Sequence, residues 1–216
     1  MKDICCELHN CLNRLPRFTF PYDVTKIPMN GIYVIFEKGE KGHGTDRIVR
    51  IGTHTGQNNL QSRLNEHFIM ENKDRSIFRK NIGRALLNQN NDSFLELWGL
   101  DLTKRENRIK FESLIDKEKK LDTERKVSKY IQRSFSFITI PVPSNDARLR
   151  LESRIISTVS LCPSCRPSLN WLGLYSPKKK IRESGLWQES ELYKQPLNFS
   201  ELEKIERFSN CMDFLQ

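Results

Sequence analysis

Five side chains that can exchange protons, bind anions or bind a metal ion stand in regular segments of this chain. They are Tyr33, Arg50, Arg63, His67 and Glu152. A phenol acts as a base only where positive charge or metal-bound water stabilises its ionised form, and arginines supply such charge. Arg63 and His67 are four residues apart, so a helix would place them on one face. The set is suited to acid–base and anion chemistry, provided that the fold brings its members together.

Glu152 is the carboxylate of this set, and its neighbours are apolar. It stands next to Leu151 and close to Ile155 in a segment with helical periodicity. Burial of a lone carboxylate is costly unless the group is paired or coordinated. Mg²⁺ is a hard, strongly hydrated cation that one carboxylate and several waters can hold. We therefore expect Glu152 to be a metal ligand; the alternative is that it faces solvent or pairs with Arg148.

Two short segments rich in β-branched and aromatic residues predict the strands that position Tyr33 and Arg50. They are residues 31–36 and 47–52. The connection over residues 37–46 holds three glycines and several charges. It predicts a solvated hairpin loop, longer than the usual connection of two to five residues.

The rest of the chain predicts helices and one further strand. Arg63 and His67 lie in a predicted helix over residues 60–70, and a second helix over 77–87 should turn Arg79 and Lys80 outward. The other predicted elements are a helix within residues 1–13, a strand or buried connector over 94–100, a long or broken helical insertion, largely solvated, over 101–132, a strand over 134–140, a helix over 147–160 and a last helix over 200–208.

The two strand motifs and the order of elements resemble those of the GIY-YIG nucleases. The first strand begins Gly31-Ile32-Tyr33, and the second ends Arg50-Ile51-Gly52, with Arg50 where the family usually has tyrosine. The resemblance implies an α+β fold with a small three-stranded antiparallel sheet flanked by helices. It covers residues 27–170, with the insertion near 101–132. Residues 1–26 are then a helical and extended lead-in, and residues 171–216 a C-terminal extension that packs on the core.

The resemblance implies that Tyr33 is the general base or orients the nucleophilic water in phosphodiester hydrolysis. The alternative is a strand tyrosine whose ring belongs to the core. Arg50 could lower the pKa of Tyr33 or bind phosphate, and it could equally mark a site of reduced activity. Arg63 corresponds to the helix arginine of the family, which neutralises charge on the transition state.

His67, Glu152 and Asn170 complete the site that the resemblance implies. His67 would hydrogen-bond the phosphate or tune the tyrosine; the alternative is a half-buried helix histidine. Glu152 would hold Mg²⁺ or Mn²⁺, which stabilises the leaving 3′ oxygen. Asn170 resembles the late asparagine that helps to order the site.

The charge balance favours a polyanionic partner. The formal net charge is +9, and cationic proteins bind nucleic acid by releasing counterions from its phosphates. This does not distinguish DNA from RNA. A basic run could bind backbone phosphates, with Trp171 and Trp187 beside it as apolar anchors of the tail. The run consists of Lys178, Lys179, Lys180 and Arg182.

The sequence contains no apolar run of the ~18–20 residues that a membrane-spanning helix needs. The first ten residues are mixed polar and lack the apolar core of a secretion signal. We therefore expect a cytoplasmic protein whose six cysteines are mostly reduced.

The cysteines allow a second kind of metal site. Cys162 and Cys165 have the spacing of a zinc knuckle. Further N-terminal donors that could complete a tetrahedral site are Cys5, Cys6, His9 and Cys11. One such knuckle without a matching second one is a weak motif, so scattered reduced thiols are the simpler interpretation.

These observations lead to two hypotheses of function. The first is a divalent-metal-dependent DNA endonuclease, of restriction or defence type, with a homodimer on a symmetric site as one route to specificity. The second is a nucleic-acid-binding module with the nuclease fold and little or no catalysis, which Arg50 in place of tyrosine motivates. An RNase or repair-type nicking enzyme would share the chemistry of the first and differ in substrate.

Overall fold

A four-stranded antiparallel sheet is the centre of the computed structural model, which describes residues 3–213. The strands are β1 (Phe18–Thr19), β2 (Gly31–Gly42), β3 (Thr45–Gly52) and β4 (Phe135–Pro141), in the order β1-β4-β2-β3. The expected α+β class is confirmed, but the sheet has one strand more than expected. The addition is β1, in which Phe18 pairs with Phe137, because the proline-rich lead-in keeps this segment extended beside β4.

The prediction of a long hairpin loop over residues 37–46 is wrong, because most of these residues belong to strands. Between β2 and β3 only His43 and Gly44 form the turn. Both have positive φ, 52° and 78°, as a tight two-residue hairpin turn requires. The pairing is irregular between Phe36 and Lys41, which is how a β-bulge absorbs unmatched residues.

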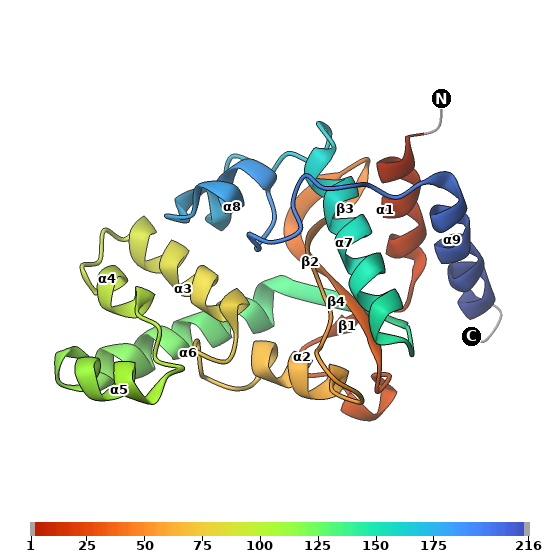
Figure 1. Ribbon diagram of the computed structural model, residues 1–216. Helices are drawn as coiled ribbons and strands as arrows, with labels where there is room; N and C mark the ends of the chain where they lie inside the picture. The colour runs from red at the N-terminus through yellow and green to blue at the C-terminus, as the bar shows by residue number, and fades with distance from the viewer. Residues whose placement is uncertain (1–2, 214–216) are drawn as a thin grey trace.

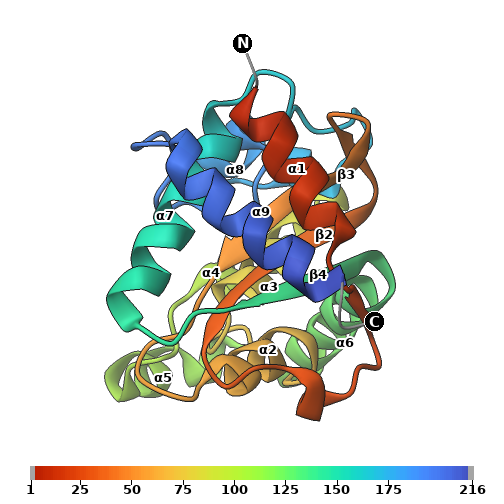
Figure 2. The same cartoon turned by 90° about the vertical axis from the view of Figure 1, so that its right-hand side faces the viewer.

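Helices cover both faces of the sheet (Figure 1). One face is covered by α2 (Leu60–Phe68), α3 (Ile77–Gln89) and α6 (Lys117–Ser134), and the other by α1 (Ile4–Arg14), α7 (Asn145–Leu161) and α9 (Phe199–Asp213). Figure 2 shows α1 and α9 side by side on the second face. Successive residues of a strand point to opposite faces, so Tyr33 belongs to the first core and Val34 to the second.

Residues 94–134 form a helical lobe at one end of the molecule (Figure 1). It consists of α4 (Phe94–Gly99), α5 (Arg105–Phe111), the 3-10 turn η2 (Glu112–Leu114) and α6. The prediction of a strand or connector over residues 94–100 is therefore wrong. Trp98 of α4 packs where a Cβ on Gly83 would lie only 2.4 Å from its ring, so the close approach of α3 and α4 depends on that glycine.

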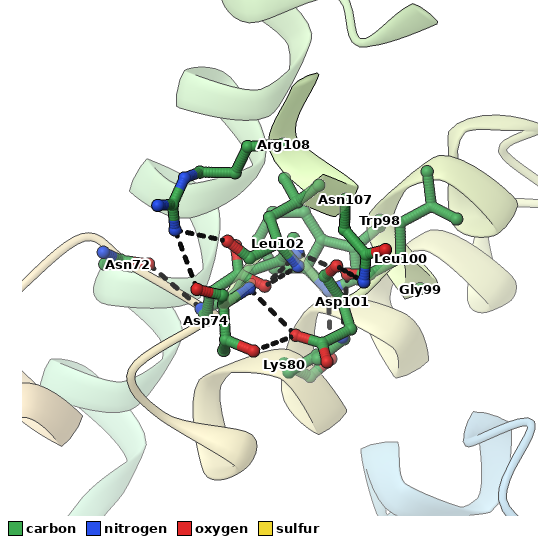
Figure 3. A network of polar contacts seen from close by, with 12 residues as sticks. Asn72, Asp74, Lys80, Trp98, Gly99, Leu100, Asp101, Leu102, Asn107 and Arg108 are labelled. Atoms are coloured by element: carbon green, nitrogen blue, oxygen red, sulfur yellow. Dashed lines mark hydrogen bonds and ion pairs between the residues drawn. The ribbon is translucent and has the colours of Figure 1, made fainter. Parts of the chain in front are cut away.

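Polar contacts fasten this lobe to α3 (Figure 3). The Lys80 ammonium donates to the Leu100 carbonyl at 2.8 Å, and the Trp98 indole donates to the Lys80 carbonyl at 3.0 Å. Lys80 is buried rather than outward-facing, because the carbonyl end of α4 needs a donor. Burial lowers the pKa of Lys80 to about 8.

The insertion is also less solvated than its charge density suggests. In the second half of α6, Val127 and Ile131 are fully buried. Glu124 accepts from Arg79 at 2.9 Å, and both side chains are essentially inaccessible. Arg79, expected on the outer face of its helix, is thus a buried ion-pair partner of α6, since residues of α6 cover that face.

The C-terminal segment completes the open edge of the sheet. It includes the 3-10 turn η3 (Leu172–Tyr175) and α8 (Lys179–Ser184); a further turn, η1 (Val24–Lys26), precedes β2. The Trp187 amide donates to the Val49 carbonyl at 2.8 Å, and the Ile51 amide donates to the Gln188 side chain at 3.0 Å. Pairing of this kind protects an exposed strand edge.

Two tryptophans anchor that segment, as the sequence predicts. The indoles of Trp171 and Trp187 both donate to one carboxylate oxygen of Glu37, at 2.7 and 2.9 Å. Burial raises the pKa of Glu37, while hydrogen bonds from Tyr130 and the two indoles oppose the rise.

None of the helices within residues 3–213 is long and apolar enough to cross a membrane.

Candidate active site

Tyr33 lies early in β2 with its ring on the side of the sheet that α2 and α3 cover. Its cross-strand partner is Gly52, the last residue of β3. A Cβ on Gly52 would lie 2.2 Å from the Tyr33 hydroxyl oxygen, closer than any side chain tolerates. The glycine that ends the second motif therefore makes the space in which the phenol lies.

The Tyr33 hydroxyl is the first link of a buried polar chain. It lies 2.7 Å from His67 Nε2, and His67 Nδ1 lies 2.7 Å from the Ser76 hydroxyl. Ser76 is the N-cap of α3 and accepts from the Arg79 amide at 3.2 Å. A neutral imidazole donates at one nitrogen and accepts at the other, so a donor bond to Ser76 leaves Nε2 to accept from Tyr33.

His67 is held neutral by its surroundings. It is fully buried, and burial lowers its pKa well below the ordinary value. The positive charges of Arg63, Arg50 and Arg79 lower the pKa further. A neutral imidazole at physiological pH is the form that can accept a proton from a phenol.

Arg63 of α2 stands half-buried beside the phenol. Its guanidinium donates to Glu66 at 2.8 Å and to the Arg75 carbonyl at 3.1 Å. Burial tends to lower the pKa of Arg63, but the Tyr33 oxygen, as charge and hydrogen-bond partner, and Glu66 hold it above its ordinary value. The cation thus stands beside the phenol.

Arg50 lies on the same face of the sheet as Tyr33, two residues before Gly52. It is 5% exposed. One guanidinium nitrogen donates to the Trp187 carbonyl at 2.6 Å, and the group lies 5.2 Å from the centroid of the Phe78 ring. Its Nε has no partner among the described residues. Arg50 therefore fixes the tail and adds positive charge beneath the site.

Glu152 reaches the site from α7, which packs on the opposite face, at the point where β3 ends. Burial raises the pKa of Glu152 to about 7, while the charges of Arg50 and Arg63 and a hydrogen bond from the Thr53 backbone lower it. These influences place the carboxylate in one electrostatic neighbourhood with both arginines. The predicted alternative partner, Arg148, instead donates to backbone carbonyls.

The residues fit a divalent cation at Glu152. Within residues 3–213 no lysine, arginine or histidine lies within ion-pair distance of this carboxylate, although its pKa reflects substantial burial. A half-buried carboxylate that accepts one backbone hydrogen bond and has no direct counter-ion can still bind a hard metal ion that keeps several waters.

An open hollow of about 380 Å³ adjoins this group. Arg63 and Thr53 line it, and both also act on Glu152, Arg63 through its charge and Thr53 through its backbone amide. Its lining consists of Thr53, His54, Thr55, Asn59, Ser62, Arg63 and Glu66. A larger hollow, of about 440 Å³, lies in the helical lobe and contains none of the five candidate residues.

Five of the predicted site residues thus come together, and the others lie elsewhere. Asn170 is exposed, and no hydrogen bond within the described residues joins it to the Tyr33 group. In the basic run, Lys178 lies 3.7 Å from Glu189, and Lys179 lies 3.5 Å from Glu183. The roles of Asn170 and of this run stay predictions.

Three further contributors to the site are not among the residues predicted from the sequence. Ser76 supports His67, Thr53 contacts Glu152, and the Trp187 carbonyl binds Arg50. Ser76 could have been noticed as a helix cap, since it directly precedes the predicted helix over residues 77–87. The other two act through backbone atoms, which leave no mark in the residue types.

The profile of the GIY-YIG domain matches residues 7–212. The chain belongs to the GIY-YIG domain family. GIY-YIG domains are nuclease domains that hydrolyse phosphodiester bonds in nucleic acids and generally depend on a divalent metal ion. In this GIY-YIG chain the first motif supplies Tyr33, while the second begins with Arg50. No curated protein and no solved structure matches the chain.

Proposed function

We propose that this protein is a divalent-metal-dependent endonuclease that hydrolyses phosphodiester bonds in DNA. The observation on which the proposal rests is the 2.7 Å contact between the Tyr33 hydroxyl and His67 Nε2, with Arg63 beside it. A base, a proton acceptor for that base and a fixed cation are the groups that hydrolysis of a phosphodiester requires. The net charge of +9 supports a polyanionic substrate.

In this proposal Tyr33 takes a proton from the attacking water as its own hydroxyl proton passes to Nε2 of neutral His67, which becomes an imidazolium. The water oxygen forms a bond to phosphorus as the bond to the leaving 3′ oxygen breaks. Arg63 neutralises charge that grows on the phosphoryl oxygens. Glu152 would hold Mg²⁺ or Mn²⁺, which stabilises negative charge on the leaving oxygen when bound.

Arg50 supports a second candidate, a DNA-binding module with little or no catalysis. Its guanidinium is used by the Trp187 carbonyl, and the family's usual tyrosine is absent at this position. Weighed against this, the Tyr33–His67–Ser76 chain is intact. We favour catalysis, because Tyr33, His67 and Arg63 lie together as the base, proton acceptor and cation that the reaction needs.

The test is cleavage of supercoiled plasmid by the purified full chain with Mg²⁺, with Mn²⁺ and with EDTA. Tyr33→Phe and Glu152→Gln should abolish cleavage, while Tyr175→Phe and Glu203→Gln, at exposed positions, should retain it. Metal-dependent binding without any cleavage would favour the binding module. Equal activity of Glu152→Gln and wild type would overturn the metal role.

A panel of substrates decides the finer points of the proposal. Duplex, nicked, branched and single-stranded DNA, together with RNA, separate a restriction-type enzyme from a nicking enzyme or an RNase. Replacement of Lys179 and Lys180 by glutamine should weaken binding evenly across sequences and flatten its salt dependence, if the basic run contacts phosphates. Sedimentation with and without a palindromic duplex would decide whether two chains act together.

A further inference from the structure

Five side chains with metal-binding atoms meet on the side of the molecule remote from the helical lobe. They come from three separate segments: the first turns of α1, the β2–β3 turn, and the stretch after α7, which lie together in both views (Figures 1 and 2). The five are Cys5, His9, His43, Cys162 and Cys165. No pattern in the sequence links His43 to the cysteines, so only the fold reveals the cluster.

The distances within the cluster are those of ligands around one tetrahedral ion. Cys5 Sγ lies 3.5 Å from Cys165 Sγ, and His43 Nε2 lies 3.2 Å from Cys162 Sγ. Zn–S and Zn–N bonds of about 2.3 and 2.0 Å put sulfur atoms ~3.8 Å apart and a sulfur and a nitrogen ~3.6 Å apart. The observed separations are a few tenths of an ångström shorter. The donor atoms of Cys5, His9, His43 and Cys165 all lie within 4.8 Å of one another.

His9 already has partners at both ring nitrogens. Nδ1 lies 2.9 Å from the Cys5 carbonyl, so it is the donor, and Nε2 accepts from the Ile48 amide at 3.3 Å. That amide stands in the irregular part of the hairpin, where the strand partner does not satisfy it. His9 Nε2 also lies 3.8 Å from Cys165 Sγ, so His9 borders the cluster. Because both of its ring nitrogens have backbone partners, we take Cys162, whose Sγ lies 3.2 Å from His43 Nε2, as the fourth ligand.

His43 has the environment of a zinc-binding histidine. Its Nε2 faces Cys162, and its Nδ1 lies 3.7 Å from a carboxylate oxygen of Asp3. Metal-bound histidines commonly donate their second ring N–H to a carboxylate, which fixes the ring and the tautomer. The orientation thus assigns Nε2 to the metal and Nδ1 to Asp3.

We propose that this protein binds one structural Zn²⁺ through Cys5, His43, Cys162 and Cys165. Three thiolates and one imidazole form a closed tetrahedral set of the structural type, without an open position for catalysis. The ion would fasten α1 and the β2–β3 turn to the segment after α7. This site is separate from the one proposed at Glu152, in ligand type as well as in place, so its test does not depend on nuclease activity.

The first experiment measures zinc in the untagged full chain, purified in reducing buffer without chelator. Mass spectrometry of the metal should give one zinc per chain. Replacement by Co²⁺ should produce the strong visible bands of a tetrahedral site and an intense thiolate-to-metal charge-transfer band. Because this uses the wild-type chain, it does not depend on whether any variant folds. A chain that contains no zinc and gives no tetrahedral cobalt spectrum overturns the proposal.

The second experiment assigns the ligands. Cys162→Ser and Cys165→Ser should each lower the zinc content well below one per chain, because each removes one of the four ligands. Cys6→Ser, on the same helix as Cys5 but outside the cluster, should keep one zinc per chain. His9→Gln and Glu152→Gln should also keep it. Loss of zinc in His9→Gln with retention in Cys162→Ser would overturn the assigned ligand set.

The third experiment addresses the redox alternative. Cys5 and Cys165 are close enough that oxidation could join them, which would remove two ligands. Intact-mass measurement of alkylated protein should find both thiols free and protected from alkylation until a chelator removes the metal. A Cys5–Cys165 disulfide in freshly purified, metal-free protein would overturn the zinc site.

Discussion

The Tyr33 hydroxyl oxygen lies 2.7 Å from His67 Nε2, although 34 residues separate the two in the chain. The contact joins the first strand of the hairpin to the helix that carries Arg63, so one hydrogen bond connects the two halves of the site. It also places the phenol against a histidine whose pKa burial keeps low.

Tyr33→Phe should therefore lower the cleavage rate by roughly 10²–10⁴-fold, since it removes the group that takes the proton. The ring would stay in place, so DNA affinity should change little, while the buried His67 Nε2 left without its partner should lower the free energy of unfolding by about 1–3 kcal/mol. Rates under single-turnover conditions, compared with affinities measured in EDTA, test this. A parallel loss of binding would mean that Tyr33 acts in substrate binding instead.

Glu152→Gln should remove a pH dependence of stability. The pKa of Glu152 is about 7 in the folded chain, against an ordinary value of 4.5. Between these values the folded state holds the extra proton, so the free energy of unfolding falls as pH rises from about 4.5 to 7. At pH 8 without metal, the variant should exceed wild type by on the order of 1–3 kcal/mol, and at pH 4 the two should agree.

The same pair of proteins tests the metal ligand. Mg²⁺ added at pH 8 should stabilise wild type and leave the stability of Glu152→Gln unchanged. The reason is that the ion binds the Glu152 carboxylate of the folded chain, and the variant has no such carboxylate. Urea unfolding with and without Mg²⁺ is the measurement. Equal stabilisation of both proteins would place the metal elsewhere.

Gly52→Ala should disable the site by displacing the phenol. The added Cβ would lie 2.2 Å from the Tyr33 oxygen, and overpacking of this kind costs about 1–3 kcal/mol. Cleavage should fall at least as far as in Tyr33→Phe. Gly99→Ala is the control, because a Cβ there meets nothing within 4 Å.

Glu124→Gln should destabilise the fold by about 3–5 kcal/mol, since it leaves the buried charge of Arg79 uncompensated. Arg79 also donates to the His67 carbonyl at 3.2 Å, so cleavage should weaken as well. Asp122→Asn in the same helix breaks an exposed pair with Lys126 and should cost less than about 1 kcal/mol. Thermal and urea unfolding give both values.

Arg50→Lys and Arg50→Met separate the charge of Arg50 from its contact with the tail. Both lose the geometry of the bond to the Trp187 carbonyl, so both should unfold more easily. Lysine keeps a positive charge near Glu152 and His67, and it should retain far more activity than methionine. If the two variants cleave equally well, the charge has no part in the reaction.

Local periodicity and the two strand motifs were enough to predict the two strands of the hairpin, the helices of Arg63 and Glu152, and the family. Each depends on a short-range pattern. The buried state of Lys80 and Arg79 could not be predicted in this way, because a basic residue on a helix has the same sequence signature whether solvent or another helix covers it. The position of His43 among the cysteines depends on how three distant segments pack.

The strand at Phe18–Thr19 and the helix at Phe94–Gly99 illustrate the same limit. The first is too short for any periodicity. The second is apolar on most sides, and a run of that length is ambiguous between strand and helix. Tertiary contacts, with β4 in one case and with Gly83 in the other, determined the outcome.

The pairing of residues 187–188 with β3 determines the stage of synthesis at which the contacts around Arg50 can form. Arg50 gains the Trp187 carbonyl as its partner only when residues 187–188 have been synthesised. The open edge of β3 gains its pairing at the same stage. A ribosome-bound chain that ends before Trp187 would contain Tyr33 and Arg63 but lack the contacts that Trp187 makes with Arg50 and β3. The site proposed for catalysis would thus gain its full set of contacts only after residues 187–188 have been synthesised.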